Sequence, residues 1–228
     1  MRTIGILGGL GPESTLEYYR EIIKAFQKNE SGYPKIVLFS ANLREFWRIL
    51  ETEQRDALIT WFTDKIFSLH DAGADFAVIA SNTPHIVFDQ VKTKVPIPML
   101  SIVEETCKKA KSMGLKKCGL LGTEFTMQST FYQKCFEEEG ISMVTPDKND
   151  QEIINEKIFS DLESGIINEQ TKKLFLGIIK KMIDNESIDS VILACTELPL
   201  ILTNDEYGIP FLSTTAIHIN SIVEYCKK

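Results

Sequence analysis

GILG at Gly5–Gly8 returns in the second half of the chain as GLLG at Gly119–Gly122, a shift of 114 positions from 5 to 119. Two further segments recur at nearly the same spacing: VIASNT at 78–83 returns as ILACTE at 192–197, and IPMLS at 97–101 returns as IPFLS at 209–213. Since the chain has 228 residues, the shift is half its length. Repetition of this kind indicates a duplicated structural unit of about 110 residues.

Short apolar, β-branched runs alternate along the chain with longer stretches of helical period, which is typical of βα units and a mainly parallel sheet. The predicted strands are 3–7, 35–40, 76–80, 99–101, 117–121, 141–144, 190–194 and 211–213. The predicted helices are 14–27, 54–72, 126–139 and 168–185. We therefore expect an α/β fold of two pseudo-symmetric lobes, each with strand carboxyl ends where ligands usually bind.

Two proline-bearing segments, Val95–Pro98 and Gly208–Pro210, are candidate crossovers between the lobes. They would let the last strand and helix complete the N-terminal lobe. The predicted lobes are then residues 1–97 with 208–228, and residues 98–207. Equivalent loops of such lobes should face each other, so we expect the active site in the cleft between them, at the loops after Ser81 and Cys195.

Composition excludes several classes of protein. The net charge is −7, with no basic run to match a phosphate backbone, so nucleic acid is not an expected partner. No apolar stretch approaches the roughly 20 residues of a membrane helix, and the N-terminus leads directly into a predicted strand, so we expect no membrane partner and a cytoplasmic protein. The 5 cysteines form no CxxC pair or metal spacing, which favours a reducing compartment and no structural metal.

The glycine-rich segment Gly8–Gly11 follows the first predicted strand. Its spacing is not G-x-G-x-x-G, so a dinucleotide site is disfavoured. A tight turn here would bring the backbone amides of Gly9, Leu10 and Gly11 near a small ligand at a helix N-terminus. A plain βα turn without a ligand is the alternative.

Ser81 and Cys195 end equivalent strands, and each is followed by polar residues. A thiol at a helix N-terminus is stabilised as thiolate, so we expect a lowered pKa for Cys195. Glu197 could assist proton transfer at Cys195 or could cap the next helix. His85 could orient the surroundings of Ser81, could move a proton, or could be an interior histidine satisfied by hydrogen bonds.

A hydroxyl-bearing loop follows the fifth predicted strand. Thr123 and Thr126 could bind a carboxylate together with backbone amides, and either could instead cap a helix.

The sequence resembles the aspartate/glutamate racemase family, the cofactor-independent racemases, over essentially its full length. The segments that carry the resemblance are GILGGLGP at 5–12 with the Ser-Thr and Tyr-Tyr pairs that follow, LGT at 121–123 through Thr126-Met127 and Phe131-Tyr132, and ACTELPL at 194–200. The resemblance implies two Rossmann-like lobes, a reaction without pyridoxal phosphate or another cofactor, and a homodimer.

In this family two cysteines face opposite sides of the substrate α-carbon, and one thiolate removes the α-proton while the other thiol supplies a proton. The resemblance makes Cys195 one catalytic base and assigns the α-carboxylate and amine to Asn82, Thr83, Thr123 and Thr196. Ser81 departs from the pattern, because family members with the full motif have cysteine there. A hydroxyl is a far poorer base than a thiol, so the two directions of racemisation should differ in rate.

The substrate that the resemblance implies is a dicarboxylic amino acid, aspartate or glutamate. Its side-chain carboxylate needs a cation, and Arg44 and Arg48 could reach the cleft, although an exposed amphipathic helix explains both equally well. Two other functions remain open at this stage. The chain could be a one-base enzyme that performs elimination or hydrolysis on a related acid, or a non-catalytic amino-acid-binding protein.

Overall fold

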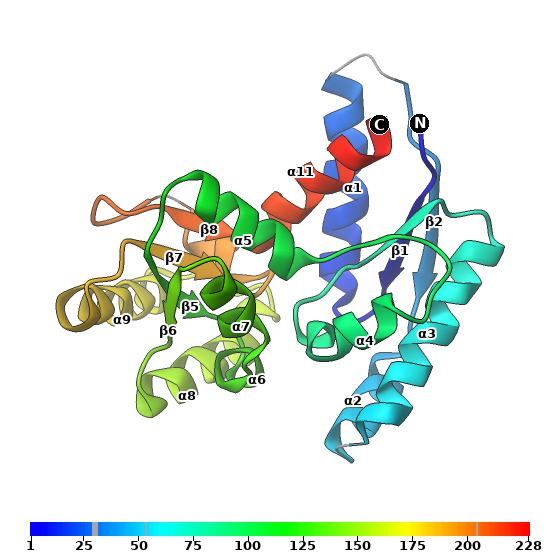
Figure 1. Cartoon of the computed structure of the whole chain (residues 1–228). Helices are drawn as coiled ribbons and strands as arrows, with labels where there is room; N and C mark the ends of the chain where they lie inside the picture. The colour runs from blue at the N-terminus through cyan, green and yellow to red at the C-terminus, as the bar shows by residue number, and fades with distance from the viewer. Residues whose placement is uncertain (29–31, 53, 204) are drawn as a thin grey trace. The chain divides into compact units, whose positions relative to one another are not determined.

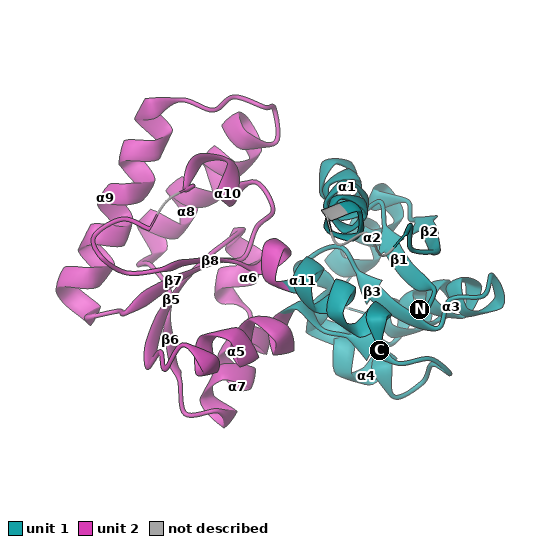
Figure 2. Cartoon of the chain, turned by 90° about the horizontal axis from the view of Figure 1, so that it is seen from above, with its two compact units in different colours: residues 1–102, 218–228 teal, residues 103–217 magenta. Residues whose placement is uncertain are grey.

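The computed structural model describes residues 1–28, 32–52, 54–203 and 205–228. The chain forms two compact units, shown in separate colours in Figure 2. Unit 1 comprises Met1–Ile102 and His218–Lys228, and unit 2 comprises Val103–Ile217. Each unit is described by itself.

Unit 1 is built on a four-stranded parallel sheet in the order β2-β1-β3-β4 (Figure 1). Its elements are β1 (Ile4–Gly8), α1 (Pro12–Lys28), β2 (Ile36–Ser40), α2 (Leu43–Glu51), α3 (Arg55–Asp71), β3 (Phe76–Ile79), η1 (Thr83–Val87), α4 (Phe88–Lys92) and β4 (Met99–Leu100). The parallel register brings the carboxyl ends of β1 and β3 side by side, since Leu7 pairs with Ile79. The loops that follow these two strands therefore share one edge of the sheet.

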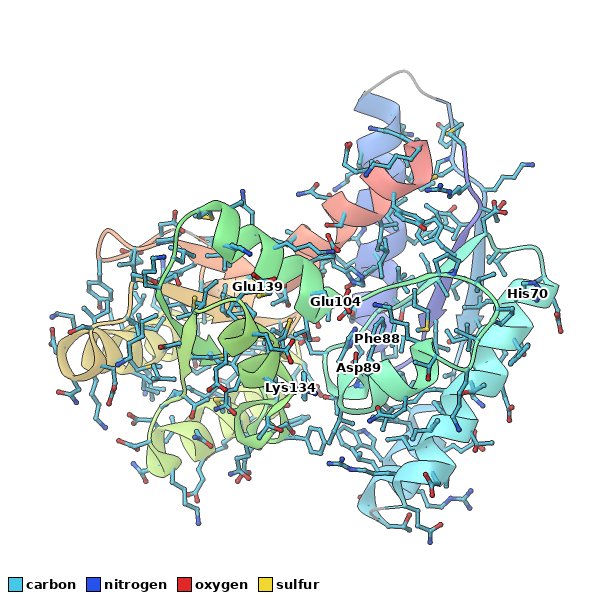
Figure 3. All side chains as sticks on the ribbon, in the orientation of Figure 1. His70, Phe88, Asp89, Glu104, Lys134 and Glu139 are labelled. Atoms are coloured by element: carbon cyan, nitrogen blue, oxygen red, sulfur yellow. The ribbon has the colours of Figure 1, made fainter. Side chains whose placement is uncertain are left out.

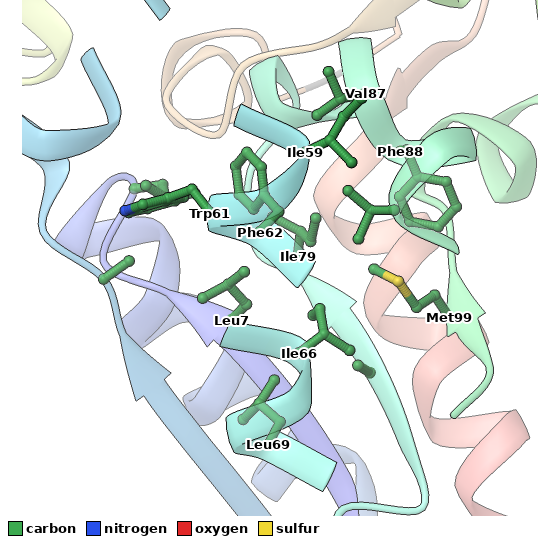
Figure 4. Close-up of a cluster of buried hydrophobic side chains, with 14 of the residues drawn as sticks. Leu7, Ile59, Trp61, Phe62, Ile66, Leu69, Ile79, Val87, Phe88 and Met99 are labelled. Atoms are coloured by element: carbon green, nitrogen blue, oxygen red, sulfur yellow. The ribbon is translucent and has the colours of Figure 1, made fainter. Parts of the chain in front are cut away.

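The two faces of this sheet are covered by different helices because side chains alternate along each strand. Leu7 and Ile79 point to a cluster with Phe62 and Ile66 of α3, which Figure 4 shows. Ile6 points to the opposite face, where α1 and the C-terminal part of α11 (Thr214–Lys227) supply the buried side chains. The central strands β1 and β3 are thus buried on both faces, as expected for parallel strands.

Unit 2 repeats the arrangement with a four-stranded parallel sheet in the order β6-β5-β7-β8. Its elements are α5 (Ile102–Ser112), β5 (Lys117–Leu121), α6 (Glu124–Gln128), α7 (Phe131–Glu138), β6 (Ser142–Val144), α8 (Lys148–Lys157), η2 (Ile158–Leu162), α9 (Glu169–Glu186), β7 (Ser190–Leu193), α10 (Leu198–Ile201) and β8 (Phe211–Ser213), followed by α11. The predicted α/β fold with two similar, parallel-stranded halves is confirmed, and the strand order is the same in both.

The chain passes between the units later than the proline segments suggested. β4 follows Val95–Pro98 yet pairs with β3 in unit 1, and β8 follows Gly208–Pro210 yet pairs with β7 in unit 2. The expectation that the last strand completes the N-terminal lobe is therefore wrong, and only the C-terminal part of α11 returns to unit 1. Pro98 and Pro210 each stand directly before a short edge strand, β4 and β8. Proline is tolerated at such positions, although it has no N–H to donate to a neighbouring strand.

One predicted helix is interrupted. Residues 126–139 form α6 and α7 rather than one helix, because Ser129 has an extended backbone with ψ 154°. Within the described residues, we find no helix with the length and apolar character needed to cross a membrane.

Candidate active site

The turn between β1 and α1 is closed by Thr15 in the first turn of the helix. The Gly9 N–H donates to Thr15 Oγ1 at 2.9 Å, and the Thr15 hydroxyl donates to the Gly11 carbonyl at 3.1 Å. Gly9 has φ +81°, and a Cβ there would lie 2.3 Å from the Ala41 carbonyl oxygen. A glycine is therefore required for the close approach of β1 and the segment after β2.

This geometry corrects part of the predicted ligand turn. The Gly9 amide is used by Thr15, so it is not offered to a ligand. The Leu10 side chain is buried in the unit 1 core with Phe46 and Trp61, so only its backbone could serve a substrate. Gly11 has φ +145°, and a Cβ built there would lie 3.5 Å from Ser14 Cβ. The surroundings of Gly11 are therefore more open than those of Gly9.

The loop after β3 carries the predicted residues Ser81, Asn82 and Thr83. The strand end is fixed on two sides, since the Ala80 N–H donates to Leu7 O at 2.9 Å and the Ser14 hydroxyl donates to Ala80 O at 2.9 Å. Asn82 and Thr83 are buried, whereas Ser81 is partly exposed. The loop therefore presents the Ser81 hydroxyl at the carboxyl edge of the sheet.

His85 is a structural support of this loop. Its Nδ1 lies 3.2 Å from the Asn82 carbonyl oxygen, and the Ile102 N–H donates to its Nε2 at 3.3 Å. The ring also stacks on Phe88 with centroids 4.7 Å apart. Since both ring nitrogens have backbone partners and burial lowers the pKa of His85 to about 3, the ring is uncharged near neutral pH and its role is to orient the loop.

In unit 2, Cys195 lies just past the end of β7 and beside a carboxylate. Its thiol donates to Glu197 Oε2 at 2.8 Å, and the Thr196 hydroxyl donates to the same oxygen at 2.8 Å. Glu197 precedes α10, but its side chain makes no capping hydrogen bond. The carboxylate therefore acts on Cys195 rather than on the helix.

The expected lowering of the Cys195 pKa is wrong. Burial of the thiol, followed by the negative charge and hydrogen bond of Glu197, raises the pKa of Cys195 well above its ordinary value. The helix that was expected to stabilise a thiolate is α10, which has only 4 residues and begins three positions after the cysteine. Desolvation and the neighbouring carboxylate outweigh the dipole of so short a helix.

Glu163 is a second carboxyl group near Cys195 that the sequence analysis missed. It follows the π-helical turn η2, where its N–H donates to Ile158 O at 2.9 Å. Partial desolvation and the charge of Glu197 raise the pKa of Glu163, and its own charge adds to the rise at Cys195. No motif marks this residue, which lies far before the cysteine in sequence. The π turn, a feature often found at functional sites, is its structural signal.

Thr123 caps α6, which is one of the two roles expected for it from the sequence. Its Oγ1 accepts from the Thr126 N–H at 3.4 Å and lies 3.1 Å from Thr126 Oγ1. Thr126 is buried, whereas Thr123 is partly exposed at the end of β5. Capping uses only the Thr123 oxygen, and when the Thr126 hydroxyl is the donor to Thr123, the Thr123 proton can be donated to an anion.

Arg44 and Arg48 lie on α2 and are exposed. The helix begins at a capping Asn42, whose side chain accepts from the Arg44 N–H at 3.0 Å. Its apolar side packs on the unit 1 core through Phe46. The structure thus contains the exposed amphipathic helix that was the alternative explanation for Arg44 and Arg48.

The sequence model of the Asp/Glu/Hydantoin racemase family matches residues 7–222. The chain belongs to this family. The broad specificity amino-acid racemase RacX of Bacillus subtilis is 30% identical over 227 residues, which cover 96% of each sequence. An aspartate racemase homologue from Pyrococcus horikoshii is 34% identical with a TM-score of 0.88, and its alignment covers 100% of both chains. A structure from Yersinia pestis, also aligned over 100% of both chains, is 32% identical with a TM-score of 0.93.

Family membership confirms the resemblance stated from the sequence and the predicted enzyme class, an isomerase of the amino-acid racemase type. The α/β fold with two four-stranded parallel sheets also agrees with the related structures. In this racemase the two loops that correspond in the repeat follow equivalent strands. Ser81 lies in the loop after β3, and Cys195 lies in the loop after β7.

Proposed function

We propose that this racemase inverts the α-carbon of a dicarboxylic amino acid, aspartate or glutamate, without pyridoxal phosphate. Cys195 is its principal base, and Ser81 takes the place of a second cysteine. The observation that carries the proposal is the 2.8 Å contact between the Cys195 thiol and the Glu197 carboxylate in a chain of this family. The contact supplies an acceptor for the thiol proton.

The first step is activation of the thiol. Cys195 is protonated in the resting protein because its pKa is raised, so the thiol proton must pass to Glu197 before the sulfur can act as a base. The thiolate then takes the α-proton and becomes a thiol again, and a carbanion remains on the substrate. The positive substrate ammonium group favours formation of the thiolate, because it offsets the negative charges of the sulfur and of Glu163.

The second step returns a proton to the opposite face of the carbanion. Ser81, or a water molecule that it holds, donates this proton and is left as alkoxide or hydroxide. This group must regain a proton from solvent, and Glu197 must release to solvent the proton that it took from Cys195. In the reverse direction the same group would have to abstract an α-proton, for which a neutral hydroxyl is a weak base. One enantiomer should therefore exchange its α-proton much faster than the other.

The substrate α-carboxylate and ammonium group are assigned to Asn82, Thr83, Thr123 and Thr196. The partly exposed hydroxyl of Thr123, at the end of β5, is the best supported of these donors. The side-chain carboxylate is assigned to Arg48, because a guanidinium forms paired hydrogen bonds with a carboxylate. We also propose a homodimer in solution, which light scattering of the purified protein would test.

Proton NMR in heavy water tests this function. The four substrates are L- and D-aspartate and L- and D-glutamate, each followed for loss of the α-proton signal and for chiral composition. We expect exchange that disappears in Cys195→Ala and persists in the control Cys118→Ala, whose thiol lies in strand β5. Exchange with a product other than the enantiomer would favour the one-base enzyme. Ligand-dependent thermal stabilisation without exchange would favour a binding protein.

A further inference from the structure

Two cysteines outside the proposed active site lie on neighbouring helices of unit 2. Cys107 is on α5 and Cys135 is on α7, and both views of the chain show these helices side by side (Figures 1 and 2). The Cys107 thiol donates to the Cys135 backbone carbonyl at 3.5 Å, and the Cys135 side chain influences the pKa of Cys107. The Cys107 sulfur therefore lies against the backbone of Cys135.

Contacts on both sides of the pair fix the alignment of the helices. Lys111 and Glu139 form an ion pair one turn further along, each four residues after the cysteine of its own segment. Figure 3 labels Glu139 at the end of α7. On the other side, the hydroxyl of buried Tyr132 is hydrogen-bonded to Thr106. Since both partners advance by one turn together, α5 and α7 run in the same direction along this contact.

The pair also differs chemically from the other thiols outside the active site. The Cys135 thiol lowers the pKa of Cys107, although burial and the negative charges of Glu139 and Glu138 oppose the change, and the positive charge of Lys111 adds to the lowering. Burial instead raises the pKa of Cys118 to about 11. Cys226 is buried and donates to Arg2 O at 3.0 Å, and its pKa is also raised by burial. Cys107 is thus the most readily ionised of these cysteines, and a thiolate is the nucleophilic form.

We propose that Cys107 and Cys135 form a redox-active dithiol, which hydrogen peroxide oxidises to a disulfide that joins α5 to α7. The Cys107 sulfur attacks one peroxide oxygen, the O–O bond breaks, and the hydroxide that leaves takes up the thiol proton as water. The product at this stage is a sulfenic acid on Cys107. Cys135 is partly exposed, which places the pair within reach of a small oxidant.

The second step closes the disulfide. The Cys135 sulfur attacks the Cys107 sulfur, the S–O bond breaks, and the departing hydroxide takes up the Cys135 proton as a second water. Overall, two thiols lose two electrons and two protons, and one peroxide is reduced to two waters. The bridge closes a loop between residues 28 positions apart, so it should constrain the unfolded chain.

Peptide mapping of the full chain after peroxide treatment tests the proposal. Of the five free thiols, three should still titrate after treatment, and a peptide pair linked through Cys107 and Cys135 should appear and vanish on reduction. The melting temperature of the oxidised protein should rise by several degrees. Cys107→Ser and Cys135→Ser should each abolish the linked peptide, whereas the control Cys118→Ser should retain it.

Three outcomes would overturn the proposal. The first is unchanged thiol content at peroxide concentrations that oxidise free cysteine. The second is oxidation of Cys118 and Cys226 as fast as the pair. The third is a linked peptide that contains Cys195. Because mapping is performed on the unaltered protein, the test does not depend on whether the serine variants fold.

Discussion

The Cys195 thiol donates to Glu197 Oε2 at 2.8 Å, so a buried sulfur is paired with the carboxylate that raises its pKa. The same carboxylate has two opposite effects. Its charge disfavours the thiolate, whereas its oxygen can accept the thiol proton. Removal of the charge should separate these effects.

In Glu197→Gln we expect the Cys195 pKa to fall, because a neutral amide no longer repels the thiolate. Alkylation of Cys195 by iodoacetamide, followed by peptide mass spectrometry across pH, should shift to lower pH. Substrate α-proton exchange should nevertheless fall by about 100-fold, because the proton acceptor is lost. Glu152→Gln on the exposed side of α8 is the control. A variant that lost exchange with an unchanged alkylation profile would contradict this account.

Ser81→Cys should restore the missing thiol of the pair. We expect α-proton exchange of the slower enantiomer to increase by about tenfold or more, because a thiol gives a far better base than a hydroxyl at neutral pH. The faster enantiomer should change less. Separate NMR measurements on the two enantiomers provide the ratio, and Ser81→Ala controls for loss of the hydroxyl. Equal acceleration of both enantiomers would show that Ser81 does not act on one face.

The strands were predictable because their signals are local. Apolar runs at 117–121 and 211–213 match β5 and β8 in both bounds, and the other predicted strands differ from the structure by one or two residues. The repeat predicted two halves of similar architecture, and the structure gives both sheets the same strand order. The interruption of residues 126–139 was missed because apolar periodicity continues through the non-helical Ser129.

The site was predictable only in its loops. Ser81 and Cys195 were found from the repeat, but the pKa of Cys195 depends on its burial and on Glu163, which tertiary structure brings near it. Sequence order also could not show that Thr15 uses the Gly9 amide. These features depend on how helices pack against strand ends, which no local pattern encodes.

Gly9→Ala should destabilise unit 1 by about 3 kcal/mol, from a left-handed backbone and the overlap of its Cβ with Ala41 O. Gly73→Ala is the matched control in the same unit. Gly73 has φ +93° but nothing within 4 Å of a Cβ, so it should cost only about 1 to 2 kcal/mol. Urea denaturation followed by tryptophan fluorescence reports on unit 1, because Trp47 and Trp61 both lie there. Equal losses in the two variants would contradict the overlap.

The two buried histidines of unit 1 should make its stability depend on pH. Burial lowers the pKa of His85 to about 3, with a further contribution from His218, and burial lowers the pKa of His218 to about 4. Both values lie below the unfolded value of about 6.5. Between these pH values the unfolded chain binds more protons than the folded one. The free energy of unfolding should therefore decrease as pH falls below about 6.5, by up to about 1.4 kcal/mol per pH unit for each histidine.

Urea denaturation of unit 1 at several pH values from 4 to 7 measures this slope. His218→Gln should flatten it, although the variant should also lose about 1 kcal/mol at pH 7 because the hydrogen bond from Tyr18 to Nδ1 is removed. His70→Gln is the control, since His70 is exposed at the end of α3 and should leave the slope unchanged. A slope that persisted in His85→Gln and His218→Gln together would assign it to carboxyl groups instead, because the chain has 3 histidines and the third is the control.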